Sequence, residues 1–255
     1  MKMGKKQILM AVVMLICSCY TTAKASEKYV EIRTPSMIEF LKNWYGIEPN
    51  EKGLYCIDSL QRVYHYKVTE LPLPSEFIYL KNISHILVRL DMCNDSTDYI
   101  LDLSIFPRHF NKYLEIISLS KIKRIIIGEE PNLTMLVIRY NCEMIDVDKC
   151  INLKNMVCSN SGLTKLNLRN NVNLEELDCS LNKLKYLDLT QNKNLKRVNC
   201  SNNLFATMDS LLLPRSIVKL NLTGNKFSHW PQYFYVKSYP KLETLQISDA
   251  IIKLK

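Results

Sequence analysis

The chain has 255 residues, with 34 Lys and Arg against 25 Asp and Glu, and therefore carries a formal net charge of +9. Its 47% hydrophobic and 23% charged residues exclude a disordered or collagen-like chain. Only six glycines are present, and neither G-x-G-x-x-G nor a Walker A motif occurs, which argues against a glycine-rich phosphate loop.

Residues 1–25 have the layout of a secretory signal peptide. A basic head, MKMGKK, precedes the apolar run Ile8–Cys17, and the small-x-small site Ala23-Lys24-Ala25 favours cleavage before Ser26. The apolar run is too short to span a bilayer, which takes about 20 residues. Removal of this segment takes four lysines and no acid with it, so the net charge falls to +5. The remaining lysines are interleaved with acids, which argues against nucleic-acid binding.

An alternative to simple cleavage is lipidation at Cys19. The segment Ile16-Cys17-Ser18-Cys19 resembles a loose bacterial lipobox. Acyl chains on Cys19 would tether the protein to a membrane, and this anchor is the one membrane attachment that we expect. Either version predicts a chain that is secreted or attached to the outer envelope.

Residues 26–108 differ in character from the rest and are expected to form an N-terminal cap with degenerate coils. Thr34 and Pro35 predict the start of a helix and Gly46 predicts its end. Apolar residues between them follow i, i+3, i+4, i+7 spacing, namely Met37, Phe40, Leu41 and Trp44. This helix would cover the open end of the structure that follows, and a separate functional module is the alternative.

A 21-residue repeat dominates residues 109–255. Residues 152–172 (NLKNMVCSNSGLTKLNLRNNV) and 173–193 (NLEELDCSLNKLKYLDLTQNK) agree at eight of 21 positions. Asn194 opens a third copy that drifts in its second half, and Asn132 opens an earlier copy that is one residue shorter. A fixed period of this length predicts a solenoid. Fragments such as Ile83-x-x-Ile86-x-Val88 and Leu114-x-x-Ile117-x-Leu119 suggest further degenerate coils.

Each repeat holds two extended stretches whose apolar residues point inward. Leu177 and Cys179 are two residues apart and therefore lie on the same side of a strand, and Leu187 and Leu189 repeat this pattern. One coil cannot bury both sets, but stacked coils bury a continuous column. We expect equivalent residues on successive coils to lie about 4.8 Å apart.

Asparagines recur at two turns of the repeat. We assign Asn141, Asn182 and Asn203 to a first column and Asn171, Asn192 and Asn225 to a second, where inward amides would bond backbone groups of neighbouring coils. Ser161 interrupts the first column and Cys150 the second.

Three cysteines at 21-residue spacing, Cys158, Cys179 and Cys200, are expected to form a buried thiol ladder. Parallel inward side chains suit a disulfide poorly, and the absence of C-x-x-C or of a histidine in register argues against zinc. A disulfide elsewhere stays open, with Cys142 and Cys150 as the nearest pair, and the pairing of Cys56 and Cys93 is undecided.

Two features follow the repeats. The segment Leu211-Leu212-Leu213-Pro214 is expected to bulge from the stack, which would resume at Ile217. The aromatic stretch from His229 to Tyr235 is expected to close the end of the solenoid, with sugar stacking as the alternative.

These patterns resemble a known family. L-x-x-L-x-[LC]-x-x-N-x-L is the leucine-rich repeat signature, and the 21-residue period with its cysteine column is similar to bacterial exported internalin-like proteins of the cysteine-ladder type. The resemblance implies a leucine-rich-repeat solenoid, that is, a curved stack of short parallel β-strands with little helix and a small helix-containing N-terminal cap. It also implies a secreted or surface-attached binding scaffold with no catalytic centre and no cofactor.

The candidate binding face comprises the outward residues of the cysteine-bearing strands. The pattern leaves open whether these strands or the L-x-L strands line the concave side, and we favour the former. Adjacent coils would bring Glu176 near Arg197. The candidate residues are Met135, Arg139, Asn155, Ser159, Glu176, Asp178, Ser180, Arg197, Asn199 and Ser201.

The sequence favours a non-catalytic scaffold that recognises a protein or a carbohydrate at the cell surface. A broad surface of mixed chemistry suits recognition by many weak contacts. The four histidines lie in unrelated contexts and no hydrolase or metalloprotease motif occurs, so neither a catalytic nor a metal site is assigned. A structural envelope lipoprotein without a dedicated ligand is the alternative.

Overall fold

The structure is a computed structural model. It describes residues 29–60, 65–68, 84–90, 99–104, 112–118, 121–227, 238–247 and 250–253. The chain divides into two compact units. Described residues 29–60 belong to the first unit, and all the described residues from 65 onward belong to the second. The expected signal peptide with Cys19, Cys93 and the aromatic stretch from His229 to Tyr235 lie outside the described residues.

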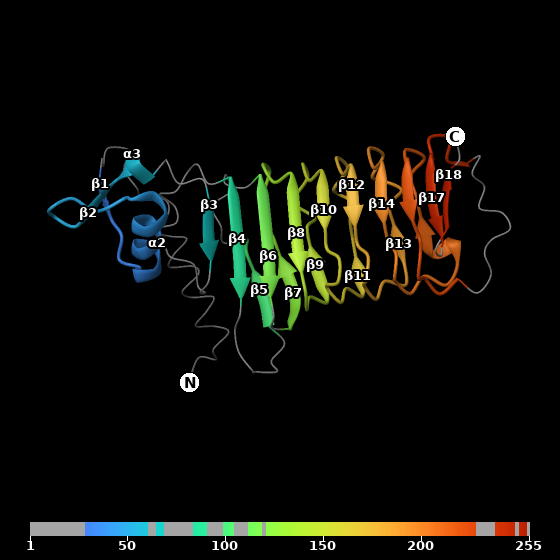
Figure 1. Cartoon of the computed structure of the whole chain (residues 1–255), viewed down its shortest axis with the longest axis horizontal. Coiled ribbons are helices and arrows are strands. Elements are labelled where there is room, and N and C mark those ends of the chain that lie inside the picture. Colours follow the sequence, from blue (N-terminus) through green and yellow to red (C-terminus); the bar gives the residue numbers. More distant parts are fainter. Residues whose placement is uncertain are drawn as a thin grey trace, which may run out of the picture. The chain divides into compact units, whose positions relative to one another are not determined.

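The described part of the first unit, residues 29–60, contains a pair of strands and two helices (Figure 1). Strands β1 (Tyr29–Glu31) and β2 (Leu54–Cys56) pair antiparallel, and helices α2 (Pro35–Tyr45) and α3 (Ile57–Leu60) complete the unit. Helix α2 has the expected bounds.

The cap residues of α2 are those predicted from the sequence, but its buried residues agree with the prediction only in part. Gly46 ends the helix in the left-handed conformation, with φ of 59°, and Thr34 is the N-cap residue but its side chain makes no capping hydrogen bond. Met37 and Leu41 are fully buried, whereas Trp44 is 76% exposed and stacks on Phe40 with ring centroids 6.5 Å apart. The expectation that Trp44 joins the buried face was therefore wrong.

The second unit is built on one sheet of ten strands, called here the main sheet (Figure 1). All neighbouring strands are parallel except the last pair. In sheet order they are β3 (His65–Val68), β4 (His85–Leu90), β6 (Tyr113–Ser118), β8 (Met135–Arg139), β10 (Asn155–Val157), β12 (Glu176–Asp178), β14 (Arg197–Asn199), β16 (Lys219–Asn221), β17 (Thr244–Ile247) and β18 (Ala250–Lys253).

A second set of shorter strands alternates with the main sheet along the chain. Four of them form one parallel sheet, namely β5 (Tyr99–Asp102), β7 (Ile122–Ile126), β9 (Met144–Asp146) and β11 (Lys165–Leu166). Two more, β13 (Leu187–Asp188) and β15 (Leu211–Leu212), form a parallel pair, and the short 3-10 helix η2 (Met208–Ser210) directly precedes β15. The chain therefore winds as a parallel-stranded solenoid with little helix, which confirms the expected leucine-rich-repeat fold.

The interior is a stack of equivalent apolar residues. Leu177 pairs in register with Met156 on one side and Val198 on the other, and all three are nearly inaccessible to solvent. The thiol ladder of Cys158, Cys179 and Cys200 lies two residues further along these coils and is fully buried. The buried column of the main sheet therefore contains the residues that the repeat predicted.

Two expectations about the coils outside the clear repeats were wrong. Leu114 pairs with Leu136 and so occupies the position of Leu177, which leaves Ile117 on the outer face rather than inside. Leu211 pairs with Leu187, so the segment after Asn203 does not bulge but supplies the next strand of the second set. The 3-10 helix absorbs the irregular sequence before this strand.

A ladder of polar side chains, the first ladder, joins the turns that follow the main-sheet strands. Asn182 donates to the carbonyl oxygens of Cys158 and Cys179 at 2.8 and 3.0 Å, and its Oδ1 accepts the N–H groups of Ser161 and Leu163. Asn203 repeats this pattern one coil later.

Other members of the first ladder differ from the expectation. Asn225 donates to Cys200 and Leu222, so it belongs to this ladder and not to the second. Ser161 does not break the ladder, because its hydroxyl donates to the carbonyl of Ile138 at 3.2 Å. Asn141 is exposed instead of buried.

The exposure of Asn141 follows from a shortened turn. Asn155 on β10 pairs with Met135, 20 residues earlier, whereas Lys165 on β11 pairs with Met144, 21 residues earlier. The connection from β8 to β9 is therefore one residue shorter than the connection from β10 to β11, and the shortening falls at the turn that contains Asn141. Without the missing residue the side chain of Asn141 cannot take the inward position.

The second ladder joins the turns that follow the second strand set. Asn171 donates to the carbonyls of Val147 and Cys150, and Asn192 repeats the pattern one coil later. Cys150 occupies the equivalent position on the preceding coil, and its thiol lies 3.8 Å from the carbonyl oxygen of Gly128.

The five cysteines of the second unit that the structure describes are free thiols. Cys142 and Cys150 are both buried and not joined to each other, and Cys56 in the first unit is also free. Burial raises the pKa of Cys142, Cys150 and Cys200 to about 12, so these thiols stay protonated and act as small apolar side chains.

Candidate binding surface

The outer face of the main sheet, called here the sheet face, carries aligned columns of side chains. Because side chains alternate along a strand, residues on either side of the buried column point outward. One column contains Met135, Asn155, Glu176, Arg197, Lys219 and Thr244, and the next contains Glu115, Val137, Val157, Asp178, Asn199, Asn221 and Gln246.

An open hollow of about 430 Å³ lies over these columns. Six of the predicted residues line it, namely Met135, Asn155, Glu176, Asp178, Arg197 and Asn199. Val157, an outward residue of β10, also lines it. Residues that the prediction did not include extend the lining toward the C-terminus, namely Lys219, Asn221, Thr244 and Gln246. The hollow is therefore a feature of the cysteine-bearing strands, which are those we favoured for the concave side.

The four other predicted residues are not in the lining of this hollow. Ser180 and Ser201 are each only 6% exposed, and their hydroxyls donate to Asp178 and Asn199 at 2.6 and 2.8 Å. Ser159 is half-buried, and Arg139 is exposed. The two buried serines orient the residues that line the hollow and do not present hydroxyls to a ligand.

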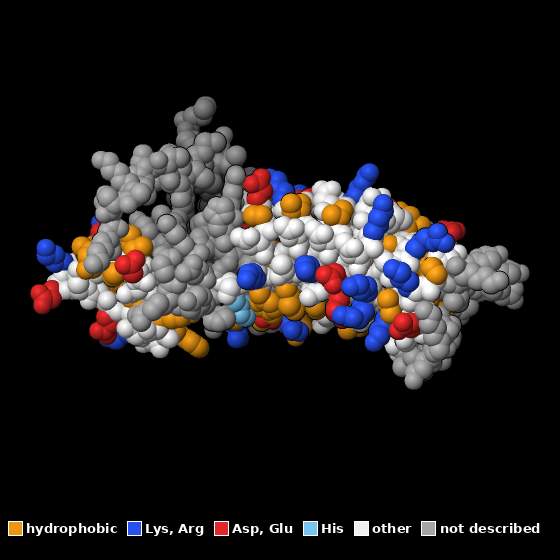
Figure 2. Space-filling view, turned by 90° about the horizontal axis from the view of Figure 1, so that it is seen from above, with side chains coloured by type: hydrophobic (Ala, Val, Ile, Leu, Met, Phe, Trp, Pro, Cys, Tyr) orange, Lys and Arg blue, Asp and Glu red, His pale blue; other side chains and the backbone are white. Residues whose placement is uncertain are grey.

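The N-terminal part of the sheet face is aromatic and apolar. His85 meets Tyr113 edge to face, with ring centroids 4.2 Å apart, and the Tyr113 hydroxyl donates to Glu115 at 3.2 Å. Burial, followed by the charge of Glu115, raises the pKa of Tyr113. Figure 2 shows hydrophobic side chains gathered beside a histidine, with acidic and basic side chains beyond them toward the C-terminal coils.

Sequence reasoning missed this apolar part because it lies on degenerate coils. Arg139 was expected on the face, and its Nε lies 3.1 Å from Glu115 Oε1, a partner that no repeat identifies. The alternation of Tyr113, Glu115 and Ile117 along one strand was the available signal.

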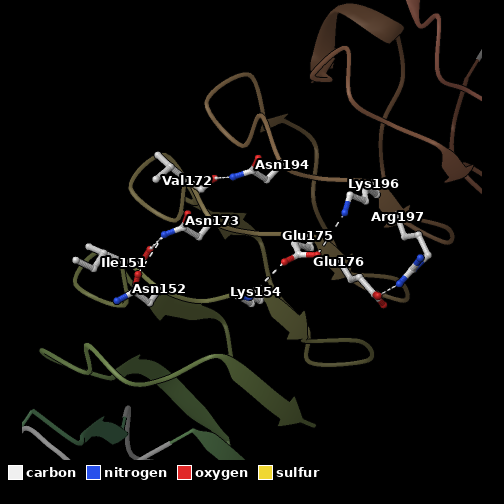
Figure 3. A network of polar contacts seen from close by, with 10 residues as sticks. All are labelled: Ile151, Asn152, Lys154, Val172, Asn173, Glu175, Glu176, Asn194, Lys196 and Arg197. Carbon is white, nitrogen blue, oxygen red and sulfur yellow. Dashed lines mark hydrogen bonds and ion pairs between the residues drawn. The ribbon is translucent and has the colours of Figure 1, made fainter.

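Charged residues at the centre of the sheet face pair across coils (Figure 3). Arg197 forms an ion pair with Glu176, as predicted from the repeat. Glu175, at the margin of the sheet, lies between Lys154 and Lys196 at 3.6 and 3.5 Å. The pairs hold these long side chains over the strands, although exposed pairs add little stability.

Two further polar features fix the surface. Asp178 accepts the N–H and hydroxyl of Ser180 through one oxygen and the side-chain amide of Asn199 through the other, at 3.2 Å. A column of asparagines at the surface, Asn152, Asn173 and Asn194, bonds backbone carbonyls of the preceding coil. Figure 3 shows the bonds of Asn173 to Ile151 and of Asn194 to Val172. The sequence carried a signal for this column, because every clear repeat begins with asparagine.

The part of the chain that the structure describes contains no group of His, Cys, Asp and Glu residues arranged to hold a metal ion. Within the same residues, no helix has the length and apolar character needed to span a bilayer. What the surface offers is a preformed array of amides, charges and apolar groups.

Comparison with solved structures identifies the same fold in bacterial proteins. The chain resembles internalin C2 of Listeria monocytogenes with a TM-score of 0.54 and 14% identity, over 89% of this chain and 100% of that one. It resembles InlP of the same organism with a TM-score of 0.51 and 19% identity, over 75% of this chain and 57% of that one.

A third solved structure is the functional domain of InlJ from Listeria monocytogenes, which includes a cysteine ladder. It matches with a TM-score of 0.44 and 17% identity over 75% of this chain, which spans about half (50%) of that domain. No family profile matches the sequence, and no curated protein does. The likeness to internalin C2 and InlP shows the fold, a leucine-rich-repeat solenoid.

Proposed function

We propose that the chain is a non-catalytic scaffold that binds a protein through the sheet face. The observation that carries the proposal is the hollow lined in register by outward side chains of consecutive strands from β8 to β17. A hollow built on a sheet changes little in shape when a partner binds, so it loses little conformational entropy.

The chemistry of the sheet face favours a protein over a small molecule. Apolar and aromatic groups lie on the N-terminal strands, while amides and ion pairs cover the central ones. A mixture of this kind, spread over many coils, matches the composition of protein interfaces. The hollow is open rather than enclosed, unlike the deep apolar clefts that bind small ligands. A carbohydrate with several hydroxyls is the second ligand class that amide-lined surfaces accept.

Export to the cell surface is part of the proposal. Its support is the sequence of residues 1–25, with a basic head, an apolar run and the site before Ser26. Measurement of the intact mass in the membrane and soluble fractions distinguishes the two forms of export. A free N-terminal Ser26 indicates release, whereas an acylated Cys19 indicates a lipoprotein and favours the structural envelope role.

Binding experiments test the sheet face directly. The purified chain is immobilised and screened against cell-surface proteins and glycans, and any ligand found is then tested on a variant with Glu176→Lys, Asp178→Lys and Arg197→Glu. We expect this variant to lose binding. A variant with Lys193→Glu and Asp209→Lys, two exposed residues away from the hollow, is the control.

A milder variant separates binding from folding, because Asp178 also holds the turn at Ser180. Lys219 lines the hollow, is exposed and forms no ion pair with the described residues. Lys219→Glu should therefore weaken binding while the melting temperature stays constant. Unchanged binding in both sheet-face variants would mean that the ligand uses another surface.

A further inference from the structure

A second surface lies at the turns that follow the main-sheet strands, called here the turn edge. One position of these turns has a positive φ on each of five successive coils, so its residues form a column. They are Tyr140 (68°), Asn160 (55°), Leu181 (56°), Asn202 (53°) and Gly224 (70°). Glycine and asparagine are the usual residues in this left-handed conformation, because a larger side chain is strained there.

Two members of the column are large and exposed to solvent. Leu181 is 53% exposed and Tyr140 is 43% exposed. The turn itself does not require them, since Asn160 and Asn202 make the same turn on the coils either side of Leu181. Strained backbone positions cluster at binding and switch sites. At Leu181 this strain coincides with an exposed apolar side chain that the turn does not need.

Leu181 lies at the rim of a groove of about 630 Å³ along the turn edge. Buried ladder residues and small groups line its inner part, namely Cys142, Ser161, Gly162 and Asn182. Lys121, Glu143 and Lys183 contribute charged side chains, and Asn141, Asn160 and Asn202 contribute exposed amides. The groove is separate from the hollow of the sheet face, with which it shares no lining residue.

The charge of the turn edge is positive. Glu143 is the single carboxylate of the groove and pairs with Lys121 at 2.8 Å. Lys183 is exposed, and so are Lys185 on the same coil and Lys165 on the preceding one. None of these three lysines forms an ion pair with residues in the described ranges. Lys121 and Lys183 line the groove against the single carboxylate of Glu143, and this excess of positive charge beside the exposed Leu181 complements a partner that carries carboxylates next to an apolar side chain.

We propose that the turn edge binds an acidic polypeptide segment. An aliphatic or aromatic side chain of the segment packs on Leu181 inside the groove, its carboxylates meet Lys183 and the neighbouring lysines, and its backbone bonds the rim amides. A polypeptide fits a groove better than a flat anionic membrane does. The proposal is independent of the sheet face, because it uses other residues.

A copolymer of glutamate and tyrosine serves as the probe, and its binding to the purified chain is followed by fluorescence anisotropy. We expect Leu181→Asn and Lys183→Glu each to weaken binding by about fivefold or more. Leu181→Asn should not lower the melting temperature, because asparagine occupies the same position on both neighbouring coils. Lys193→Glu, an exposed lysine outside the groove, is the control and should change binding by less than about twofold.

Four results would overturn the proposal. The first is a wild-type chain that does not bind the copolymer, and the second is a Leu181→Asn variant that binds as tightly as wild type. The third is an equal loss in the Lys193→Glu control, which would indicate attraction to net charge alone. The fourth is tighter binding to phosphatidylglycerol vesicles with the same dependence on Leu181 and Lys183, which would assign the edge to a membrane surface.

Discussion

The two ladders of turn side chains do similar work with different chemistry. In the first ladder, Asn182 and Asn203 donate to carbonyls and also accept backbone N–H groups. In the second, Asn171 and Asn192 donate in the same way, but their buried Oδ1 atoms have no hydrogen-bond partner among the residues that the structure describes. The first ladder therefore needs a donor and an acceptor, and the second needs a donor alone.

This difference explains which residues can take the place of asparagine in each ladder. A thiol can donate, so Cys150 is sufficient in the second ladder. Ser161 is sufficient in the first because the preceding turn is short, and its own carbonyl accepts the N–H of Cys142 at 2.6 Å. The backbone thus takes over the acceptor role that the asparagine oxygen has elsewhere.

The free energy of unfolding that is lost from the buried apolar column of the main sheet is the reference for the losses expected in the two ladders. Leu177→Ala should lower the free energy of unfolding by about 2–5 kcal/mol, because it empties an enclosed position that is 2% exposed. Chemical denaturation measures this loss. A ladder substitution that costs more than Leu177→Ala would show that hydrogen bonds, rather than packing, dominate the stack.

Alanine substitution in each ladder tests their difference. Asn182→Ala leaves the buried N–H groups of Ser161 and Leu163 without their acceptor and should cost about 3 kcal/mol. Asn171→Ala removes two hydrogen bonds, but the carbonyls of Val147 and Cys150 still accept the N–H groups of Cys150 and Leu153, so it should cost about 2 kcal/mol. Denaturation of the two variants side by side gives the comparison. Equal costs, or a larger cost at Asn171, would contradict the donor-only account of the second ladder.

The position before Cys150 in the second ladder is held by Glu130, which gives the ladder a pH dependence. Burial raises the pKa of Glu130 to about 8, above the value of an unfolded glutamate, so its contribution is full at low pH and is lost as pH rises from about 5 to about 8. Glu130→Gln should remove this loss, which reaches at most about 1.4 kcal/mol per pH unit. If the stabilities of wild type and of Glu130→Gln change with pH in the same way, Glu130 is not protonated in the folded protein.

The smallest effect is expected on the outside of the sheet. Glu175 lies between Lys154 and Lys196, but all three side chains are solvated, so Glu175→Ala should change stability by less than about 0.5 kcal/mol. Thermal denaturation at low salt measures the change. A loss comparable to that of Leu177→Ala would mean that inside and outside are wrongly assigned.

The repeat period predicted the strands, the buried column and the Glu176–Arg197 pair, because identical spacing places equivalent residues on adjacent coils. It failed where coil length changes. Asn225 was assigned to the wrong ladder because its coil has 22 residues between equivalent positions, from Asn203 to Asn225. The placement of Asn141 failed because of one lost residue, which a period cannot locate within a coil.

The binding surfaces depend on features that periodicity does not encode. The apolar end of the sheet face comes from Tyr113 and its neighbours, on coils whose sequences no longer match the repeat. The strain at Leu181 was invisible because a positive φ follows from the turn geometry of the whole stack. Sequence therefore located the scaffold more securely than the surfaces it presents.

Coils 152–172 and 173–193 begin at equivalent residues and present equivalent hydrogen-bonding groups to the coils next to them. A duplication of such a unit would create no new kind of junction, because each added coil meets a copy of its former neighbour. The length of the molecule, and with it the reach of its recognition surfaces, is thus open to evolution and to engineering in steps of one coil.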